Sequence, residues 1–394
     1  MKSVRDVVIT AAVRTPIGSY NGELASIAAP QLGSLVIREV LKRSNLKPEQ
    51  VDEVIMGNVL SAGEGQAPAR QAAIFAGLPT SVACMTINKV CGSGLKAVML
   101  AAQAIALGDA DIIVAGGMES MSNVPYYLMN ARFGYRMGNG EVIDGMVHDG
   151  LWDVYNNFHM GNAAELCAKE CSVPREAQDE FSVLSYKRAL EAQEKGWFKE
   201  EILPVQIKTK KAEINVEKDE EPGKVNFDKI SALRPAFQKD GTVTAANASK
   251  LNDGAAAVVV MAKDIANKIG IEPMAEIVDY STASKDPEWF TTAPADAISK
   301  LLKKTNLNKD NIDLFEINEA FAVVSLAVNQ ILGLDVTKVN VAGGAVALGH
   351  PIGASGARIL TTLLYNLKRT NGKKGIASLC IGGGEAVAVL VERI

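Results

Sequence analysis

One cysteine at the entrance to a predicted helix is the residue best placed for covalent chemistry. Cys91 lies in the stretch 86–96, where a short apolar run leads into a helical pattern that ends at Gly108. A thiol at a helix N-terminus faces unpaired amide N–H groups and the positive end of the helix dipole, and both favour the nucleophilic thiolate. Gly92 and Gly94 would let a substrate carbonyl approach the backbone closely. Cys91 is therefore a candidate nucleophile; the alternative is a small buried side chain at a tight helix start.

A second glycine-rich helix entrance, at residues 343–356, carries His350, which is one of only three histidines in the sequence. The helical pattern that follows it matches the pattern that follows Cys91. A Cys–His pair is the minimum arrangement for an activated thiolate nucleophile. We therefore expect His350 to act on Cys91, although a histidine before proline can also be a structural cap.

Two further polar groups stand at the ends of predicted strands. Cys380 ends the strand 375–380 and precedes a run of glycines that includes Gly382, so a second acid/base group would lie beside backbone N–H donors able to form an oxyanion hole. Asn318 follows the strand 314–317, and polar groups at the carboxyl end of a strand often reach a ligand. A buried strand cysteine and an Asx turn or helix N-cap are the structural alternatives.

The elements that must position these groups alternate between strands and helices. Apolar strand patterns at 7–13 and 53–56 alternate with helical patterns that start at Ala29 and after Cys91. This alternation predicts parallel strand pairing and a layered α/β core.

The last third of the sequence repeats the first. Residues 29–58 and 293–318 both begin with Ala-Pro, pass a basic stretch that ends in Asn-Leu, and finish with an apolar strand and an asparagine. The repeat is too long to be a solenoid period. It predicts two similar α/β halves related by a pseudo-twofold axis, with one site built from both halves.

The middle of the chain resembles neither half. Residues 121–246 begin with a concentration of aromatic side chains and end near a charged run at 208–221. We interpret them as an inserted loop domain that covers the site, between an N-terminal half at 1–120, completed by about 247–270, and a C-terminal half at 271–394. The charged run is predicted to be a solvated loop, the alternative being that its lysines meet an anionic ligand.

Composition argues against several classes of protein. The net charge of −4 and the lack of a long basic block give no support for nucleic-acid binding. The five cysteines show no disulfide spacing, which favours a reducing compartment, and Cys167 and Cys171 lack the further ligands of a metal site. The N-terminus lacks the features of a signal peptide, and no uninterrupted apolar run reaches membrane-spanning length. We expect a cytoplasmic protein with no metal and no membrane attachment.

Seven motifs, in order along essentially the whole chain, resemble the thiolase family. They are NKVCGSG (88–94), AGGME (115–119), HMG (159–161), NAS (247–249) with NDG (252–254), NEAF (318–321), GHPIGASG (349–356) and CIGGG (380–384). The resemblance is strongest to the short-chain biosynthetic members. It implies an α-β-α-β-α layered fold, a homotetramer, and the reversible condensation of two acetyl-CoA molecules to acetoacetyl-CoA and CoA, with CoA as substrate or product and no cofactor.

The resemblance also implies a role for each catalytic candidate. Cys91 would take up the acetyl group as a thioester, His350 would draw the proton from Cys91, and Cys380 would deprotonate the methyl group of the second acetyl-CoA. Asn318, through a water, would join His350 in one oxyanion hole, and the N–H groups of Cys91 and Gly382 would form the other. A Claisen condensation needs this set: a covalent acyl carrier, a base for a weakly acidic C–H bond, and donors for an enolate oxygen.

A binding channel for the pantetheine chain of CoA follows from the same resemblance. Ser249 and His159 would line it. The other residues expected to bind substrate or CoA are Leu151, Met160, Phe237, Ala248, Phe290 and Phe321.

Among the departures from the family pattern, which include Ala342 in place of a usual asparagine, three bear on substrate binding. Lys250 stands where glycine usually follows Asn-Ala-Ser, and Gly223 stands where an arginine usually contacts the nucleotide end of CoA. Lys224 or Lys250 is our hypothetical substitute for that arginine. Phe290 replaces a usual Met-Gly segment and is expected to reshape the acyl pocket.

Rival functions remain open on the sequence alone. A degradative thiolase would use the same residues on longer 3-ketoacyl-CoA esters, mainly in the cleavage direction. A ketoacyl-carrier-protein synthase would rely on a Cys-His-His or Cys-His-Asn set, which the second thiol, Cys380, disfavours. A non-catalytic, thiolase-like lipid-binding protein would be expected to have lost Cys91, His350 or Cys380. Because both thiols must reach one substrate, oxidation could also join Cys91 to Cys380.

Overall fold

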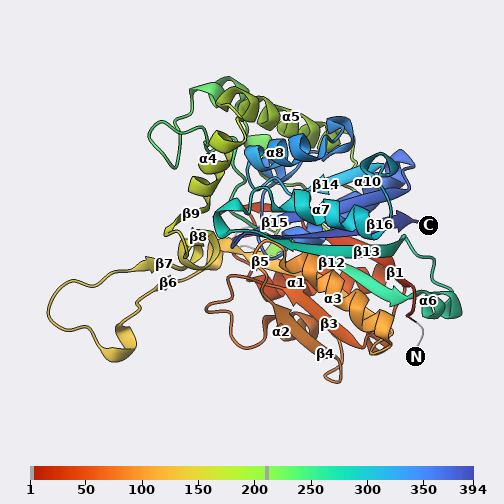
Figure 1. Cartoon of the computed structure of the whole chain (residues 1–394). Helices are drawn as coiled ribbons and strands as arrows, with labels where there is room; N and C mark the ends of the chain where they lie inside the picture. Colours follow the sequence, from red (N-terminus) through yellow and green to blue (C-terminus); the bar gives the residue numbers. More distant parts are fainter. Residues whose placement is uncertain (1–3, 209–212) are drawn as a thin grey trace.

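Helices and strands alternate along most of the chain (Figure 1). The computed structural model describes residues 4–208 and 213–394; part of the charged run at 208–221 therefore lies outside the described residues. The helices are α1 (Ala29–Arg43), α2 (Pro68–Ala76), α3 (Ser93–Leu107), α4 (Met160–Glu170), α5 (Arg175–Glu194), α6 (Lys263–Ile269), α7 (Ala293–Lys304), α8 (Ala322–Leu332), α9 (Ala345–Leu348) and α10 (Ser355–Thr370). The longer strands are β1 (Val7–Arg14), β3 (Glu53–Gly57), β4 (Ala83–Ile87), β5 (Ile112–Ser120), β10 (Val205–Lys208), β11 (Glu213–Val216), β12 (Asn252–Ala262), β13 (Ala275–Ser284), β14 (Leu314–Ile317), β15 (Lys374–Ile381) and β16 (Glu385–Arg393). The two-residue strands are β2 (Gly18–Ser19), β6 (Tyr126–Tyr127), β7 (Ile143–Asp144), β8 (Trp152–Asp153) and β9 (Phe158–His159).

The two halves predicted from the repeat have the same strand order. The strands of the main sheet follow the order β14-β15-β16-β13-β1-β12-β5-β3-β4. Read from its outer edge inward, the first half is β4-β3-β5-β12-β1, and the second half is β14-β15-β16-β13. The position of β4 is taken in the second half by Val339, which forms a parallel bridge to Phe315 of β14. The halves meet where β1 pairs with β13 over a short stretch. The pseudo-twofold relation is therefore confirmed.

Strand direction differs from the prediction. Among the strand-to-strand pairs of the main sheet in the described residues, β3 with β4, β3 with β5, and β14 with β15 are parallel, whereas the pairs among β1, β5, β12, β13, β15 and β16 are antiparallel. The predicted parallel pairing is confirmed for the outer strands of each half but is wrong for the strands between them. The reason is that β12 follows the inserted segment, and β16 follows β15 through a tight turn at Gly383 and Gly384, whose φ values are 88° and 87°. A tight turn between adjacent strands joins them antiparallel.

Apolar clusters on either side of the sheets define the layers. One cluster lies between the first half's sheet and α1 and α2, another lies between the second half's sheet and α7 and α8, and a central one includes residues of α3, α10 and both halves. The order of layers is therefore α-β-α-β-α, as expected, with α3 and α10 packed together in the middle.

The central helix α3 has the composition of a membrane span without being one in this fold. Val90–Leu107 is long and apolar enough to cross a membrane by length and composition. The helix packs instead against α10, β3, β5 and β12, and its face in the central cluster is fully buried. An all-round apolar helix is what a central layer requires.

The inserted segment is anchored to both halves. Arg14, at the end of β1, donates from Nε to Glu201 at 2.5 Å and from Nη1 to Asp219 at 2.6 Å, and all three side chains are buried. Helices α4 and α5 pack against α8, and α5 also packs against α9. The division of the chain at residues 120 and 246 stays a prediction, but this packing places the segment beside the second half's helices.

Glycines allow α3 and α10 to approach each other backbone to backbone. A Cβ on Gly94 would lie 2.7 Å from the amide nitrogen of Ala357, and a Cβ on Gly356 would clash with the amide nitrogen of Leu95. Backbone atoms of two packed helices cannot yield as a flexible side chain can. These two glycines occupy equivalent positions in the two halves, so the contact lies near the pseudo-twofold axis.

We expect Gly356→Ala to destabilise the protein by about 2 kcal/mol or more, since overpacking of a rigid contact costs roughly 1–3 kcal/mol or above. Gly223→Ala is the matched control, because a Cβ there meets no atom within 4 Å and the position has no positive φ. Urea denaturation of both variants measures the difference. Equal midpoints for Gly356→Ala and the parent would contradict this account of the interface.

Candidate active site

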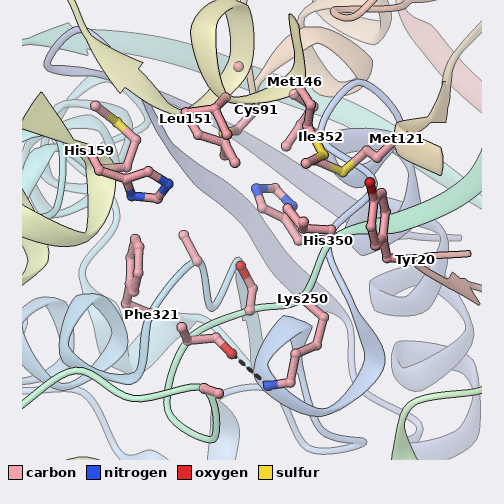
Figure 2. Close-up of a pocket in the computed structure, with 18 of the residues that line it drawn as sticks. Tyr20, Cys91, Met121, Met146, Leu151, His159, Lys250, Phe321, His350 and Ile352 are labelled. Carbon is pink, nitrogen blue, oxygen red and sulfur yellow. Dashed lines mark hydrogen bonds between the residues drawn. The ribbon is translucent and has the colours of Figure 1, made fainter. Parts of the chain in front are cut away.

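A cavity of about 570 Å³ opens between the two halves and the inserted segment (Figure 2). Nearly all the predicted site residues line it. They are Cys91, Leu151, His159, Met160, Phe237, Ala248, Ser249, Phe290, Phe321, His350 and Gly382. Cys380 and Asn318 are the two exceptions, and both are buried next to lining residues. The structure thus brings together residues that the sequence scatters over nearly 300 positions.

The turn that carries Cys91 is held in a rare backbone conformation. Val90 has a φ of 44°, which a β-branched residue seldom adopts. Three hydrogen bonds hold it there: Val90 N–H donates to Asn88 Oδ1 at 2.9 Å, Lys89 N–H donates to Ser93 Oγ at 2.8 Å, and Ser93 Oγ donates to the Val90 carbonyl at 2.7 Å. The asparagine and serine of the NKVCGSG motif therefore build the turn that aims Cys91 into the cavity.

Burial has a larger effect on the pKa of the Cys91 thiol than the N–H groups near the helix N-terminus. Burial raises the pKa of Cys91 to about 11, while the N–H groups of Gly382 and of Cys91 itself lower it, and Glu119 raises it further. The N–H groups act in the predicted direction, but the expectation that the site favours a resting thiolate was wrong. Loss of hydration disfavours the charged sulfur. Cys91 is a thiol at neutral pH.

His350 is neutral, and its tautomer follows from its neighbours. Burial, with a contribution from the positive charge of Arg358, lowers the pKa of His350 to about 3. Its Nδ1 lies 2.6 Å from Ser355 Oγ, and that hydroxyl donates to the Pro351 carbonyl at 2.9 Å. Because the hydroxyl hydrogen is used, we assign the proton to Nδ1, which leaves the lone pair of Nε2 as an acceptor. Asn252 Oδ1 accepts the His350 backbone N–H at 2.8 Å and fixes the loop.

A thiol with a high pKa and an imidazole with a low pKa do not form a resting ion pair. Proton transfer from Cys91 to His350 must then accompany attack on the substrate, when the sulfur's charge passes to the acyl oxygen. Donors for that oxygen are present, since the N–H groups of Gly382 and Cys91 face the sulfur.

Alkylation of Cys91 by iodoacetamide should accelerate through pH 10, by close to tenfold for each pH unit, because the thiolate fraction rises about tenfold per unit below the pKa. Peptide mass mapping of Cys91 at intervals from pH 6 to pH 10 measures the rate, with glutathione as the free-thiol reference. A plateau below pH 8 would instead mean a preformed thiolate–imidazolium pair.

Cys380 is placed as a base rather than as a nucleophile. It is fully buried at the end of β15, and burial, with a smaller contribution from Cys91, raises the pKa of Cys380 well above its ordinary value. A thiolate generated there would be a stronger base than an ordinary one. The glycines that follow it bring Gly382 to the cavity wall.

The Asn318 side chain faces His350. Its Nδ2 lies 3.5 Å from both ring nitrogens, and its Oδ1 is buried without a hydrogen-bond partner among the residues described. The alternative of a helix N-cap is wrong, because α8 begins at Ala322 with Phe321 as its N-cap. The amide is therefore available to a molecule bound between Asn318 and His350.

Aromatic rings form one wall of the cavity. His159 stacks on Phe237 with ring centroids 4.8 Å apart, Phe237 meets Phe321 edge-on at 6.3 Å, and Phe290 meets Phe321 at 6.5 Å. His159 also caps α4, where its Nδ1 accepts the Gly161 N–H at 3.0 Å. Burial lowers the pKa of His159, which favours the neutral ring. The wall is apolar with one neutral polar edge, which suits an amide-bearing aliphatic chain.

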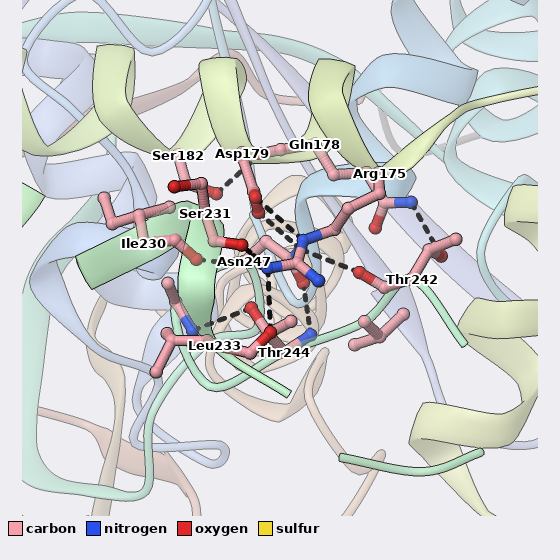
Figure 3. A network of polar contacts seen from close by, with 12 residues as sticks. Arg175, Gln178, Asp179, Ser182, Ile230, Ser231, Leu233, Thr242, Thr244 and Asn247 are labelled. Carbon is pink, nitrogen blue, oxygen red and sulfur yellow. Dashed lines mark hydrogen bonds and ion pairs between the residues drawn. The ribbon is translucent and has the colours of Figure 1, made fainter. Parts of the chain in front are cut away.

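A polar network attaches the loop before Ser249 to α5 (Figure 3). Arg175 pairs with Asp179 at 2.8 Å, and Asp179 accepts from Asn247 Nδ2 at 3.1 Å. Asn247 Oδ1 then accepts the Thr244 N–H at 2.8 Å. Since Asn247 directly precedes Ala248 and Ser249, the network positions the part of the wall predicted to contact pantetheine.

The two lysines proposed to replace the missing arginine occupy different environments. Lys250 Nζ donates to the Ala248 carbonyl at 2.8 Å, so it is turned into the protein (Figure 2). Lys224 also lines the cavity; its Nζ donates to Ser19 Oγ at 2.5 Å and pairs with Glu220 at 3.1 Å. Its side chain is 51% exposed, so Lys224 is the more accessible of the two lysines to a phosphate from solvent.

Sequence reasoning missed the apolar side chains around the nucleophile. Met121, Met146 and Ile352 form a small cluster against which Cys91 packs. The two methionines come from the inserted segment, where no helix or strand periodicity marks them as lining residues. Ser355 and Asn252 were also missed as His350 partners, although both lie within motifs of the family.

The two spare cysteines lie at the C-terminal end of α4, with Cys167 in the helix and Cys171 as its C-cap. Cys167 and Cys171 lie 3.9 Å apart between sulfurs, and burial raises the pKa of Cys167 to about 12. A metal-binding cysteine must be deprotonated. Within residues 4–208 and 213–394, no group of three His, Cys, Asp or Glu side chains gathers with a metal-binding arrangement.

Comparison with known families agrees with this geometry. The family model described as "Thiolase, N-terminal domain" matches residues 7–264, and "Thiolase, C-terminal domain" matches residues 271–393. The chain belongs to the thiolase family. The two models divide the chain where β12 and α6 end the first half.

Similar proteins extend over the whole chain. An acetyl-CoA acetyltransferase of Cupriavidus necator is 57% identical over 390 residues, which cover 98% of this chain and 99% of the relative. One of Schizosaccharomyces pombe is 51% identical and covers 99% of each chain. Among solved structures, the Acat5 thiolase of Ascaris suum in complex with coenzyme A superimposes with a TM-score of 0.95 at 44% identity, covering 99% of this chain and all of that one. The acetyl-CoA acetyltransferase of Bacillus anthracis superimposes with a TM-score of 0.98 at 44% identity over the whole of both chains.

Proposed function

We propose that this thiolase is an acetyl-CoA C-acetyltransferase, which condenses two acetyl-CoA molecules to acetoacetyl-CoA and CoA and also catalyses the reverse reaction. The observation that carries the proposal is the meeting of Cys91, His350 and Gly382 in one cavity, with Cys380 and Asn318 directly behind it. The names of relatives that cover the whole chain at 51% to 57% identity support the same activity.

The first half-reaction forms an acetyl thioester on the enzyme. The Cys91 sulfur attacks the thioester carbonyl of acetyl-CoA while its proton passes to Nε2 of His350, which becomes an imidazolium. The C–S bond to CoA breaks, and the departing thiolate takes the proton of Cys380. This step leaves acetyl-Cys91, protonated His350, the Cys380 thiolate and free CoA thiol, so protons and charge balance.

The second half-reaction returns each group to its starting state. The Cys380 thiolate removes a proton from the methyl group of a second acetyl-CoA, and the resulting carbanion attacks the acetyl carbonyl on Cys91. The Cys91 thiolate leaves and recovers its proton from His350. Because the raised pKa of Cys380 makes its thiolate a stronger base, burial favours removal of a weakly acidic C–H proton.

Developing negative charge meets donors at two places. The N–H groups of Cys91 and Gly382 lie beside the sulfur, where the oxyanion of each tetrahedral intermediate would form. Protonated His350 and the Asn318 amide face the position proposed for the enolate oxygen. The residue that takes the proton from Cys91 thus becomes a donor in the following step.

A short acyl group is favoured over a long one. Met121, Met146 and Ile352 pack against Cys91, and this packing supports a small acyl group on the sulfur. Phe290 is buried in the cavity wall, as expected of a residue that shapes an acyl pocket. A degradative thiolase for longer 3-ketoacyl-CoA esters is the second candidate, and it would need these side chains to move.

Cleavage of acetoacetyl-CoA by CoA tests the proposal. We expect kcat/KM for acetoacetyl-CoA to exceed that for a longer 3-ketoacyl-CoA by about tenfold or more, since about 1.4 kcal/mol of lost fit corresponds to a factor of ten. Cys91→Ser should lose at least about a thousandfold, because a hydroxyl cannot replace the nucleophile. Cys84→Ser is the matched control, on β4 outside the cavity. Preference for the longer ester would assign the protein to the degradative group.

We also propose that four copies assemble. An arm between β6 and β7 projects from the body and carries exposed apolar side chains (Figure 1). They include Leu128, Met129, Phe133, Met137 and Val142. β4 ends the sheet with an unpaired edge and exposed Met85. Exposed apolar arms and open edges are usually covered by a partner.

The free cysteines fit our further proposal of a cytoplasmic location.

Light scattering on the purified protein should give the mass of a homotetramer. The double variant Phe133→Ser with Met137→Ser should give a smaller assembly without unfolding, because these side chains are solvent-exposed in the single chain. Circular dichroism serves as the folding control. A parent that elutes as a monomer would rule out the assembly.

A further inference from the structure

Lys250 places a positive charge beneath the wall of the CoA channel. It follows Ser249 directly and lines the cavity, and a dashed line in Figure 2 marks the hydrogen bond from its ammonium to a backbone carbonyl. The ammonium donates to the Ala248 carbonyl at 2.8 Å and reaches the Val346 carbonyl at 3.5 Å. None of the catalytic steps above uses this group, although a buried ammonium is costly unless it has partners.

The Ala248 carbonyl takes no part in the hydrogen bonds of the β-bridge that its segment forms. Residues 247–249 pair with 320–322 as a short antiparallel bridge, in which Ser249 N–H donates to the Ala320 carbonyl at 2.9 Å and Ala322 N–H donates to the Asn247 carbonyl at 2.8 Å. Along a strand, successive carbonyls point to opposite sides. The carbonyl of Ala248 therefore points away from its bridge partner, and the Lys250 ammonium meets it there.

The second contact joins this wall to the segment that carries His350. Val346 lies in α9, a single turn whose last carbonyls have no partner within the helix. A cation at a helix C-terminus also interacts favourably with the carbonyl dipoles. Because His350 lies just beyond α9, one ammonium links the segment that ends in Ser249 to the segment that leads to His350.

Two neighbouring side chains stabilise a positive charge on Lys250, while burial opposes it. The Tyr186 ring centroid lies 5.8 Å from Lys250 Nζ, within the range of a cation–π contact, and Glu221 lies close enough to favour the charged form. Burial is the larger influence and lowers the pKa of Lys250 to about 8. Lys250 is thus a half-buried cation whose ammonium has two carbonyls and a ring face around it and a carboxylate near enough to favour its charge.

We propose that Lys250 is a positioning residue that clamps the Ala248–Ser249 wall of the CoA channel to α9, and so sets the affinity for the pantetheine part of the substrate. The inference rests on the proposed function. It replaces our hypothesis that Lys250 contacts the nucleotide end of CoA, because its ammonium is held by backbone carbonyls instead.

Removal of the ammonium should weaken substrate binding more than it slows the chemistry. For Lys250→Ala we expect KM for acetoacetyl-CoA to rise about tenfold with kcat within about threefold of the parent, the pattern of a lost binding interaction. Lys250→Met retains the stem without the charge and should show the same rise, which separates the loss of charge from the loss of packing.

Chemical rescue tests the clamp directly. Lys250→Ala leaves two carbonyls and an empty space, so ammonium chloride should restore a low KM, while tetramethylammonium chloride at the same ionic strength should not, since it has no N–H to donate. Lys338→Ala is the matched control: that half-buried lysine donates to the Ile312 carbonyl at 3.2 Å, far from the cavity. Its kinetics should be unchanged with either salt.

An unchanged KM in both Lys250 variants, or equal responses of Lys250→Ala to the two salts, would overturn the proposal. A parent that turns over neither 3-ketoacyl-CoA would overturn the proposed function instead. In that case calorimetric titration with CoA still decides on the clamp, because weaker binding by Lys250→Ala that ammonium alone restores would support it.

Discussion

The close approach of two helix N-termini at the centre of the molecule is the constraint on which the site depends. At Gly94 and Gly356, α3 and α10 meet backbone to backbone, and Gly117 lies against the Gly353 carbonyl, where a side chain would clash. Each helix is entered by a turn that carries one half of the catalytic pair, Cys91 or His350. Without side chains at the contact, these turns can lie on one cavity wall; with them, the turns would be pushed apart.

Burial is the second determinant, because it sets the protonation state of both partners. The same loss of hydration raises the pKa of Cys91 to about 11 and lowers that of His350 to about 3. The two groups therefore rest uncharged, and charge develops only when a substrate oxygen can be stabilised by the N–H groups of Gly382 and Cys91. Such an arrangement protects an unliganded thiol from reaction while leaving it competent toward a thioester.

The inserted segment supplies part of the wall of the cavity that holds Cys91 and His350. Its later part is fixed by the buried pairs of Arg14 with Glu201 and Asp219 and by the Arg175–Asp179–Asn247 network. Its earlier part, before these anchors in the chain, supplies Met121, Met146 and His159 to the wall. The aromatic stack, the loop that carries Ser249 and the proposed Lys250 clamp belong to the same wall, so substrate affinity and catalytic geometry are supported by one set of contacts.

The sequence by itself determined the two-half organisation, the family, and the placement of Cys91 and His350 at helix entrances, since periodicity, glycine positions and collinear motifs are local properties of the chain. Only the tertiary structure decided strand direction, because β12 follows the inserted segment and β16 follows a tight turn after β15. It also decided that Cys91 rests as a thiol, because desolvation depends on every element packed around the sulfur. For the same reason, inspection of the residues alone could not identify Met121 and Ile352 as neighbours of the nucleophile, or the Val346 carbonyl as a partner of the Lys250 ammonium. These contacts join segments that lie 30, 261 and 96 positions apart along the chain, and no local pattern in the sequence marks them.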